Sequence, residues 1–353
     1  MTNRRKFIKN SAALTALSLI PTSTLFADHF SAPKSSVELP KIFPKRLKKG
    51  DLIGLVTPGG TITEEQLYET KNKLEEFGFE TYYNDSVLAQ YGYFAGTDKE
   101  RADELMHMFT NDNVDAILAV RGGYGAIRIL DMLDYSIIQN NPKILIGYSD
   151  ITALLTAIYE RTGLITFHGP VGVSTFNDFT FKSVEKVLIN PGNRYKYPYD
   201  RDNDTALNPE YDIYTITGGK AEGQLIGGNL SVLESMIGSA YEPDFEKKIV
   251  YLEEIEEKTY RIDKMLFHLL SSTNLKKAAG IILGVFDGCN TSSEGPAFTL
   301  KQAVTDLLKP LRIPISYGLP FGHIESKITI PNGIKARLNA DKNTLKLLEK
   351  AVV

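Results

Sequence analysis

The sequence predicts an α/β fold in which a parallel sheet forms the N-terminal part and a mixed α/β arrangement forms the C-terminal part. Up to about residue 180, short and nearly unbroken apolar runs alternate with helical patterns, as in parallel sheets covered on both faces. After Phe181 the chain becomes polar, aromatic and irregular. This change predicts an N-terminal domain over 51–180, a connection over 181–204 and a C-terminal domain over 205–353.

The N-terminal elements have local signals. The apolar run Ile53–Thr57 predicts a buried strand that ends at the turn Pro58-Gly59-Gly60. A capping box of Thr63 and Gln66 then predicts a helix that runs to about Phe77. The remaining predicted elements are a strand over 79–87, a helix over 99–111 behind a capping box of Thr97 and Glu100, a strand over 114–120, a glycine turn entering a helix over 121–133, a strand over 143–147 and a helix after Ser149.

The C-terminal part mixes apolar strands with helices. The segment 248–257 looks like a buried strand, and a helix is expected near 259–270. The segment 329–349 predicts a hairpin, with turns at Pro331-Asn332-Gly333 and at 339–343.

Composition excludes several classes of protein. The 353 residues are 42% apolar and 24% charged, as in soluble globular proteins. A net charge of −3 without a basic stripe argues against nucleic-acid binding. The histidines lack the spacing of a zinc site, so no metal or cofactor is predicted. The single cysteine, Cys289, cannot form an internal disulfide.

Residues 1–27 have the layout of a secretory signal peptide. A basic start precedes an apolar stretch from Ala12 to Ile20, and Ala27 is a small residue before a polar change. The stretch is too short to span a bilayer, and Arg4-Arg5 with its neighbours resembles a twin-arginine export signal. A Pro- and Lys-rich linker follows over 28–50. We therefore expect a periplasmic protein without a membrane span; a disordered basic tail is the alternative.

Ser149 is a candidate nucleophile because it lies on a sharp turn between a predicted strand and a helix. In open parallel sheets, ligands bind beyond the carboxyl ends of the strands. The backbone N–H of Asp150, with one from the turn at Gly122 and Gly123, would be placed to hold an oxyanion. The alternatives are that Ser149 caps a helix and that Arg121–Gly125 is only a tight turn.

Histidines and glutamates supply candidate partners for this serine. His323 lies in a glycine-flanked loop and is a better general-base candidate than the helical His107 and His268. His168 ends a strand, where it could line a cleft. Glu253 and its neighbour Glu254 point to opposite faces of a predicted strand, so one could enter a cleft while the other is solvated.

Nine segments, in order over about residues 45–340, resemble the LD-carboxypeptidase family of serine peptidases, which includes muramoyltetrapeptide carboxypeptidases and microcin-immunity peptidases. The resemblance implies a Rossmann-like parallel-sheet N-terminal domain, a smaller barrel-like C-terminal domain and often a homodimer. The segments are GDLIGLVTPGG, FAGTDKERADELMHMF, AVRGGYGAIRILDMLDY, IGYSDITALL, FHGPV, GQLIGGNLSVLESMIGSAYEPDF, IVYLEEIEEKTYRIDKML, GIILGVFDGC and GLPFGHIESKITIPNG.

The resemblance also implies the chemistry. The nucleophile of the family's Ser-Glu-His triad falls on Ser149, the acid on Glu253 and the base on His323, with Glu254 departing from the family's Leu-Glu-Asp motif. The implied reaction releases terminal D-alanine from a murein tetrapeptide without a metal, at the interface of the two domains. The family usually works in the cytoplasm, so an export signal is a departure.

Two other functions stay open. A microcin-immunity-type peptidase would cleave an aminoacyl-adenylate mimic, but the chain has no Trp to stack on adenine, although 18 Tyr and 17 Phe could substitute. An exported binding protein for wall peptides that has lost catalysis would not need Ser149, Glu253 and His323 together.

Overall fold

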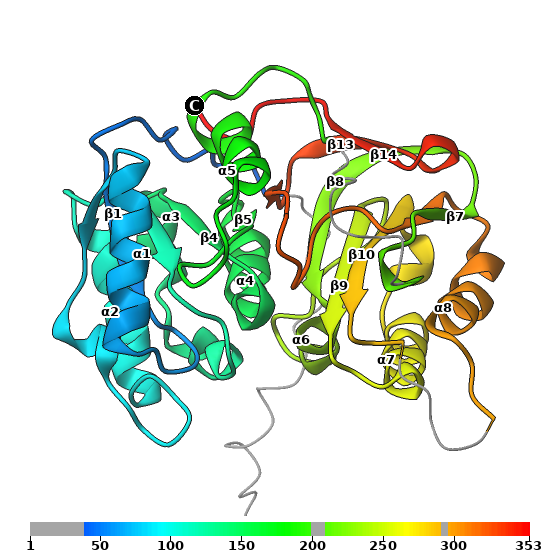
Figure 1. The fold of residues 1–353 in the computed structure, drawn as a ribbon, viewed down its shortest axis with the longest axis horizontal. Helices are drawn as coiled ribbons and strands as arrows, with labels where there is room; N and C mark the ends of the chain where they lie inside the picture. Colours follow the sequence, from blue (N-terminus) through cyan, green and yellow to red (C-terminus); the bar gives the residue numbers. More distant parts are fainter. Residues whose placement is uncertain (1–38, 199–208, 291–295) are drawn as a thin grey trace, which may run out of the picture. The chain divides into compact units, whose positions relative to one another are not determined.

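Two β-sheets with their helices make up the part of the chain that the structure describes (Figure 1). The structure is a computed structural model, and it describes residues 39–198, 209–290 and 296–353. Residues 39–353 pack as one unit. The predicted signal peptide over 1–27 and the first part of the linker lie outside the described residues.

The first sheet has six strands in the order β12-β5-β4-β3-β1-β2. All neighbours are parallel except β12, which pairs antiparallel with β5. Every residue of β3 and β4 is buried, which confirms the predicted parallel sheet with two covered faces. The strands are β1 (Leu52–Val56), β2 (Glu80–Tyr82), β3 (Ala116–Ala119), β4 (Ile144–Gly147), β5 (Phe167–His168) and β12 (Ile330–Pro331); the helices of this part are α1 (Glu64–Glu76), α2 (Asp98–Thr110), α3 (Tyr135–Asn140), α4 (Thr152–Thr162) and α5 (Asp178–Val184).

Both predicted capping boxes are present. The Thr63 side chain accepts from the Gln66 backbone while the Gln66 side chain accepts from the Thr63 backbone, and Thr97 and Glu100 do the same. These reciprocal bonds satisfy backbone N–H groups that the first turn of a helix cannot pair. The starts of α1 and α2 are therefore confirmed.

Two N-terminal predictions were wrong in extent or type. The strand expected over 79–87 ends at Tyr82 and gives way to a 3-10 helix at Asp85–Leu88, because β2 is an edge strand that pairs only with β1. The helix expected over 121–133 is a 3-10 helix at Ala126–Met132. It is confined between Gly125, whose φ is 125°, and the cap that Asp134 provides for α3, so it stays short.

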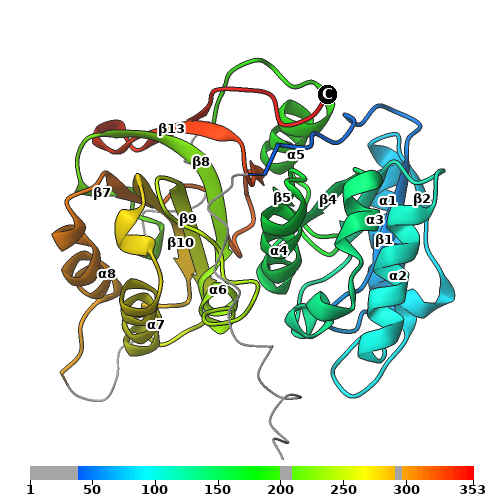
Figure 2. The same ribbon diagram turned by 180° about the vertical axis from the view of Figure 1, so that it is seen from behind.

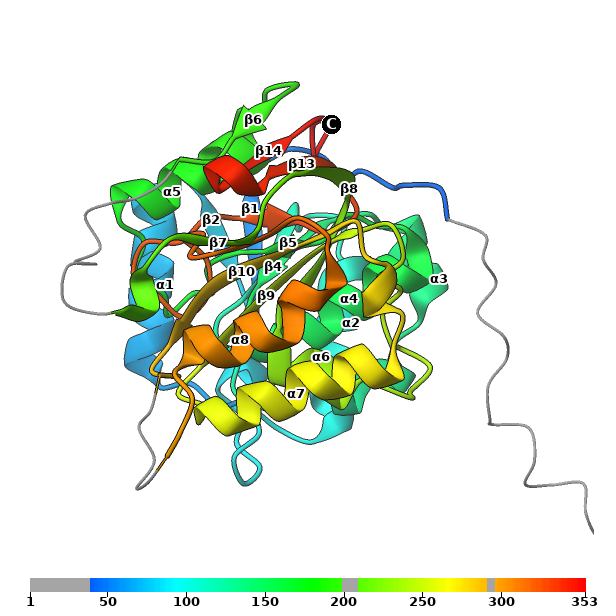
Figure 3. The same ribbon diagram turned by 90° about the vertical axis from the view of Figure 1, so that its right-hand side faces the viewer.

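The second sheet has eight strands in the order β6-β14-β13-β8-β9-β10-β11-β7. Its central strands β8, β9, β10 and β11 are parallel and the outer pairs are antiparallel, which confirms a mixed second sheet. Figure 3 shows α7 and α8 together on one face of it. The strands are β6 (Tyr195–Lys196), β7 (Tyr214–Thr217), β8 (Lys220–Asn229), β9 (Ile249–Ile255), β10 (Gly280–Asp287), β11 (Ile315–Tyr317), β13 (Lys335–Asn339) and β14 (Thr344–Leu347); the helices are α6 (Leu230–Ser235), α7 (Thr259–Ser272) and α8 (Leu300–Leu308).

The segment 318–331, which we call the crossing segment, runs from the second sheet into the first. It leaves β11 and ends in β12, whose Ile330 pairs with His168 of β5. The hairpin predicted over 329–349 is therefore correct only for β13 and β14, since β12 belongs to the other sheet. The edge position of β12 tolerates Pro331, which has no backbone N–H to donate.

Helix α4 is a second connection between the two sheets, because it contacts β4 and β5 of the first sheet and β8 of the second. Figure 2 shows it between them. Tyr159 of α4 donates to the Gln224 side chain of β8 at 2.8 Å, and the Asn229 backbone donates to Thr152 Oγ1 at 3.0 Å. Gly228 permits this approach, because a Cβ there would lie 2.5 Å from Thr152. The part of β8 from Gln224 onward is thus fixed along α4, with the end of the strand held at the start of the helix.

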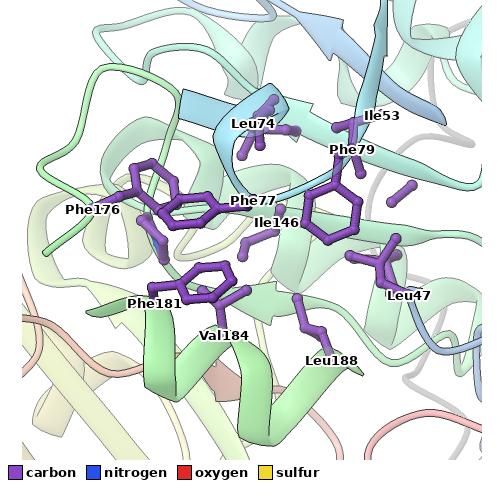
Figure 4. A pocket seen from close by; sticks show the side chains of 14 residues that line it. Leu47, Ile53, Leu74, Phe77, Phe79, Ile146, Phe176, Phe181, Val184 and Leu188 are labelled. Atoms are coloured by element: carbon purple, nitrogen blue, oxygen red, sulfur yellow. The ribbon is translucent and has the colours of Figure 1, made fainter. Parts of the chain in front are cut away.

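A small apolar cavity of about 40 Å³ lies in the N-terminal core (Figure 4). The rings of Phe77 and Phe181 stack at its wall with centroids 3.7 Å apart. Leu, Ile, Val, Ala, Phe and Pro side chains line it throughout, so it is a packing feature of the core with no group for catalysis.

Candidate active site

Three turns meet at the carboxyl edge of the first sheet. They follow β1 at Gly59 and Gly60, β3 at Gly122, and β4 at Ser149. Parallel strands end at one edge, so turns that are far apart in sequence become neighbours there. The Gly60 N–H donates to the Gly122 carbonyl at 2.8 Å, which joins the first two turns.

Ser149 has a strained backbone at the third turn. Its φ is 63°, in the left-handed region that side-chain-bearing residues rarely occupy. A Cβ on Gly122 would lie 3.2 Å from Ser149 Oγ and 3.3 Å from the Asp150 nitrogen, so the glycine leaves room beside both groups. Within the described residues the Ser149 hydroxyl makes no capping hydrogen bond, and the helix-cap alternative is not supported.

Asp150 holds the turns together through its side chain. Its buried carboxylate accepts a hydrogen bond from the Ala126 backbone at 2.9 Å, which joins the turn after β3 to the turn after β4. Burial raises the pKa of Asp150. The hydrogen bonds from the backbone of Ala126 and Gly125 and the charge of Arg101 oppose this shift. Arg101, itself buried, donates to the Pro58 carbonyl and pairs with Asp98, which fixes the turn after β1.

Glu253 and His323 form a buried pair. His323 Nδ1 donates to Glu253 Oε2 at 2.8 Å, the Glu253 side chain is fully buried, and 13% of the His323 side chain is exposed. Burial alone lowers the pKa of His323, but the charge of Glu253 and the hydrogen bond to it prevail and raise it. Burial alone raises the pKa of Glu253, but the charge and hydrogen bond of His323 lower it below its ordinary value.

Tyr148 connects this pair to the serine turn. Its ring lies 4.7 Å from that of His323, centroid to centroid, in an edge-on arrangement, and it directly precedes Ser149 in the chain. Among the described residues no hydrogen bond joins Ser149 and His323. Such contacts are often loose without substrate and tighten in the complex. The structure thus pairs two of the three predicted residues and places the third beside their aromatic neighbour.

Glu254 is buried. The expectation that one of the two adjacent glutamates is solvated was therefore wrong. The Glu254 carboxylate accepts from the Asn229 side chain at 3.0 Å and from the Ser231 backbone at 2.8 Å. It therefore stabilises the start of α6, which packs against this side of β9. Alternation along β9 does separate the two glutamates, but both faces of the strand are covered.

Two further ionisable residues lie near His323. His168 pairs with Gly147 across β4 and β5, and its complete burial lowers its pKa to about 4, so it is neutral at physiological pH. Lys327 is 5% exposed, and its Nζ lies 4.8 Å from the centre of the Tyr148 ring. The sequence indicated His168 as a residue that could line a cleft, but it did not indicate Lys327. The available signal was a lysine four residues after His323, directly before the apolar residue Ile328 and three residues before β12.

The other histidines in the described residues have local partners. His107 contacts the Tyr82 hydroxyl at 2.9 Å, and His268 pairs with Glu234 at 2.6 Å. Over residues 39–198, 209–290 and 296–353, no three His, Cys, Asp or Glu side chains gather as metal ligands would. In the same ranges, no helix combines the length and apolar character needed to cross a membrane.

A strained serine at the carboxyl edge of a parallel sheet, next to a buried carboxylate–imidazole pair, is the arrangement of a serine hydrolase. Residues 53–169 match the LD-carboxypeptidase N-terminal domain and residues 222–338 match the LD-carboxypeptidase C-terminal domain. The chain belongs to the LD-carboxypeptidase family and is a serine carboxypeptidase.

The sequences and structures of individual relatives support this family assignment. A probable murein peptide carboxypeptidase of Bacillus subtilis is 36% identical over 306 residues, which cover 85% of this chain and 92% of the relative. The solved microcin C7 self-immunity protein MccF in complex with aspartyl sulfamoyl adenosine has a TM-score of 0.81 at 28% identity, over 88% of this chain and 100% of that one. The muramoyltetrapeptide carboxypeptidase of Oxalobacter formigenes has a TM-score of 0.72 at 28% identity, over 84% and 97%. The predicted family and fold class are confirmed.

Proposed function

We propose that the protein is a serine LD-carboxypeptidase that releases terminal D-alanine from murein tetrapeptides through Ser149, His323 and Glu253. The observation that carries this proposal is the 2.8 Å hydrogen bond between His323 and Glu253. The His323 ring lies against Tyr148, the residue that precedes Ser149. A buried carboxylate that orients an imidazole prepares that imidazole to act as the general base for a neighbouring nucleophile. The proposed substrate class comes from relatives that are named carboxypeptidases of murein peptides.

The proposed reaction proceeds in two steps. His323 Nε2 accepts the proton of Ser149 Oγ while that oxygen bonds to the scissile carbonyl carbon. The backbone N–H of Asp150, with one from the Gly122–Gly123 turn, stabilises the oxyanion. The imidazolium then protonates the leaving amine of D-alanine, the C–N bond breaks, and water hydrolyses the acyl-serine by the same route. Glu253 keeps the proton on Nδ1 and stabilises the imidazolium.

Purified enzyme is expected to convert a tetrapeptide that ends in D-alanine into tripeptide and free D-alanine in equal amounts, with and without EDTA. The products are quantified by mass spectrometry. The matched control is the same peptide ending in L-alanine, which is expected to remain intact. Absence of D-alanine release, or its loss in EDTA, would contradict a metal-independent LD-carboxypeptidase.

A microcin-immunity-type peptidase is the second candidate, because the structure resembles the solved microcin self-immunity protein over almost all of the described chain. The chain has no Trp, so adenine would have to stack on Tyr or Phe. Comparing turnover of the tetrapeptide with that of an aminoacyl sulfamoyl-adenylate separates the two. A fluorophosphonate probe that labels Ser149 would exclude a binding protein without catalysis.

We also propose that the enzyme acts in the periplasm, as a homodimer, after export through a twin-arginine signal. Support for export comes from residues 1–27 alone, and the homodimer rests on the family resemblance. Changing Arg4 and Arg5 together to Lys keeps the charge but removes the pair that this pathway recognises, so export of the folded enzyme is expected to stop. Immunoblots of periplasmic and cytoplasmic fractions measure this. Normal export of the double variant would indicate a general secretory signal, and cytoplasmic full-length wild type would contradict export.

A further inference from the structure

Lys327 is a buried cation, and none of the residues that the structure describes forms an ion pair with it. It lies in the crossing segment, where its backbone N–H donates to Thr180 Oγ1 at 3.0 Å, so its position against α5 is fixed. Its side chain extends to Tyr148, with Nζ 4.8 Å from the ring centre. Within the described residues no carboxylate forms an ion pair with this ammonium, and no acceptor forms a hydrogen bond with it.

A buried ammonium is costly unless it is paired. Contact with the face of a tyrosine ring offsets only part of that cost. Burial lowers the pKa of Lys327 to about 8, while the charges of Glu253 and Glu325 oppose the shift. The hydrogen bond from His323 uses only Oε2 of Glu253, and within the described residues neither oxygen of that carboxylate forms an ion pair with the Lys327 ammonium.

We propose that Lys327 binds the α-carboxylate of the amino acid that the enzyme releases, and thereby restricts cleavage to the end of the peptide. The proposal rests on the function proposed above and identifies the group that recognises the substrate's terminus. Its geometric basis is Tyr148, whose ring contacts both the Lys327 ammonium and the His323 imidazole, and which precedes Ser149. In the leaving amino acid the amine and the carboxylate share one Cα. A cation close to the base that protonates the amine is therefore where the carboxylate arrives.

The neighbouring candidates are less suitable. His168 is neutral at physiological pH because of its burial. Arg121, beside Gly122, is exposed and donates from its guanidinium to the Thr61 carbonyl at 3.0 Å. A solvated cation binds a carboxylate less strongly than a partly dehydrated one does.

The test compares two tetrapeptides that differ only in whether the terminal D-alanine carries a free carboxylate or a carboxamide. For wild type, kcat/KM is expected to be on the order of 100-fold higher with the carboxylate. Lys327→Met is expected to lose about that factor on the carboxylate peptide and to keep its activity on the carboxamide within about threefold. Lys327→Arg should recover part of the preference, because it keeps the charge but alters the geometry.

Lys301→Met is the matched control, because Lys301 also lies over a tyrosine ring, that of Tyr214, at 4.3 Å, but at the exposed start of α8. It should leave both substrates unaffected. Equal losses of Lys327→Met on both peptides would overturn the inference, since they would show a general effect on structure or on His323. Wild type that cleaves neither peptide would overturn the proposed function and the inference together.

A further measurement needs no substitution and is not affected by misfolding of a variant. D-alanine should inhibit the wild-type enzyme more strongly than D-alaninamide does. Equal inhibition by the two compounds would also overturn the inference.

Discussion

Replacement of Ser149 by alanine is expected to lower kcat/KM for D-alanine release by roughly 10⁴-fold or more, because the variant has no oxygen to form the acyl-enzyme. The fold should remain intact, since the Ser149 hydroxyl makes no hydrogen bond within the described residues and its removal breaks no packing contact of a large side chain. Steady-state kinetics measure the loss, and circular dichroism checks the fold. Activity within tenfold of wild type would show that Ser149 is not the nucleophile.

Ser149→Gly separates the chemistry from the backbone strain. Ser149 has a φ of 63°, where alanine is strained as serine is, whereas glycine is not. The glycine variant is therefore expected to be as inactive as Ser149→Ala but more stable than it by about 1 kcal/mol in the free energy of unfolding. Urea unfolding of the two variants provides the comparison. A glycine variant less stable than the alanine variant would mean that the turn stores no strain.

Replacement of Glu253 by glutamine is expected to reduce kcat by roughly 10⁴-fold, because a neutral amide no longer holds the His323 proton on Nδ1. The pH dependence should shift as well. His323 must be neutral to act as a base, so kcat/KM falls as the pH drops through its pKa, which Glu253 raises. Without that charge, burial lowers the pKa, and the acidic limb of the residual activity should move to lower pH.

Glu254→Gln is the matched control for Glu253→Gln. The two residues are adjacent in β9 and both are buried, but Glu254 binds the start of α6. Within the described residues it forms no hydrogen bond with His323, and its charge raises the pKa of His323 less than that of Glu253 does. Its replacement should lower the free energy of unfolding and leave kcat within about tenfold of wild type. Similar kinetic losses in both variants would contradict a specific role for Glu253.

The features that the sequence predicted well are local. The capping boxes of α1 and α2 depend on side chains three residues apart, and the buried strands β3 and β4 are unbroken apolar runs. Glu253 and His323 were each candidates from their local sequence, but their pairing came from the family resemblance, since 70 positions separate them in the chain. Their contact depends on how two sheets pack.

The features that the sequence did not predict depend on tertiary structure. The burial of Glu254 requires α6 to cover β9, and nothing in the acidic run itself indicates that. The assignment of β12 to the first sheet requires β5 to offer an open edge. Lys327 was not among the residues that the sequence singled out, because its burial and its position over Tyr148 depend on how the crossing segment packs.

The late position of the crossing segment in the chain has a consequence for the order in which the proposed active site would be assembled during synthesis. The ribosome makes Ser149 and the whole parallel core of the first sheet early, and such a domain folds as it emerges. The proposed base and the proposed carboxylate anchor are made near the end of translation, and they reach the serine only when β12 adds to β5. A chain that ends before His323 lacks the proposed base and is therefore expected to be inactive as a peptidase.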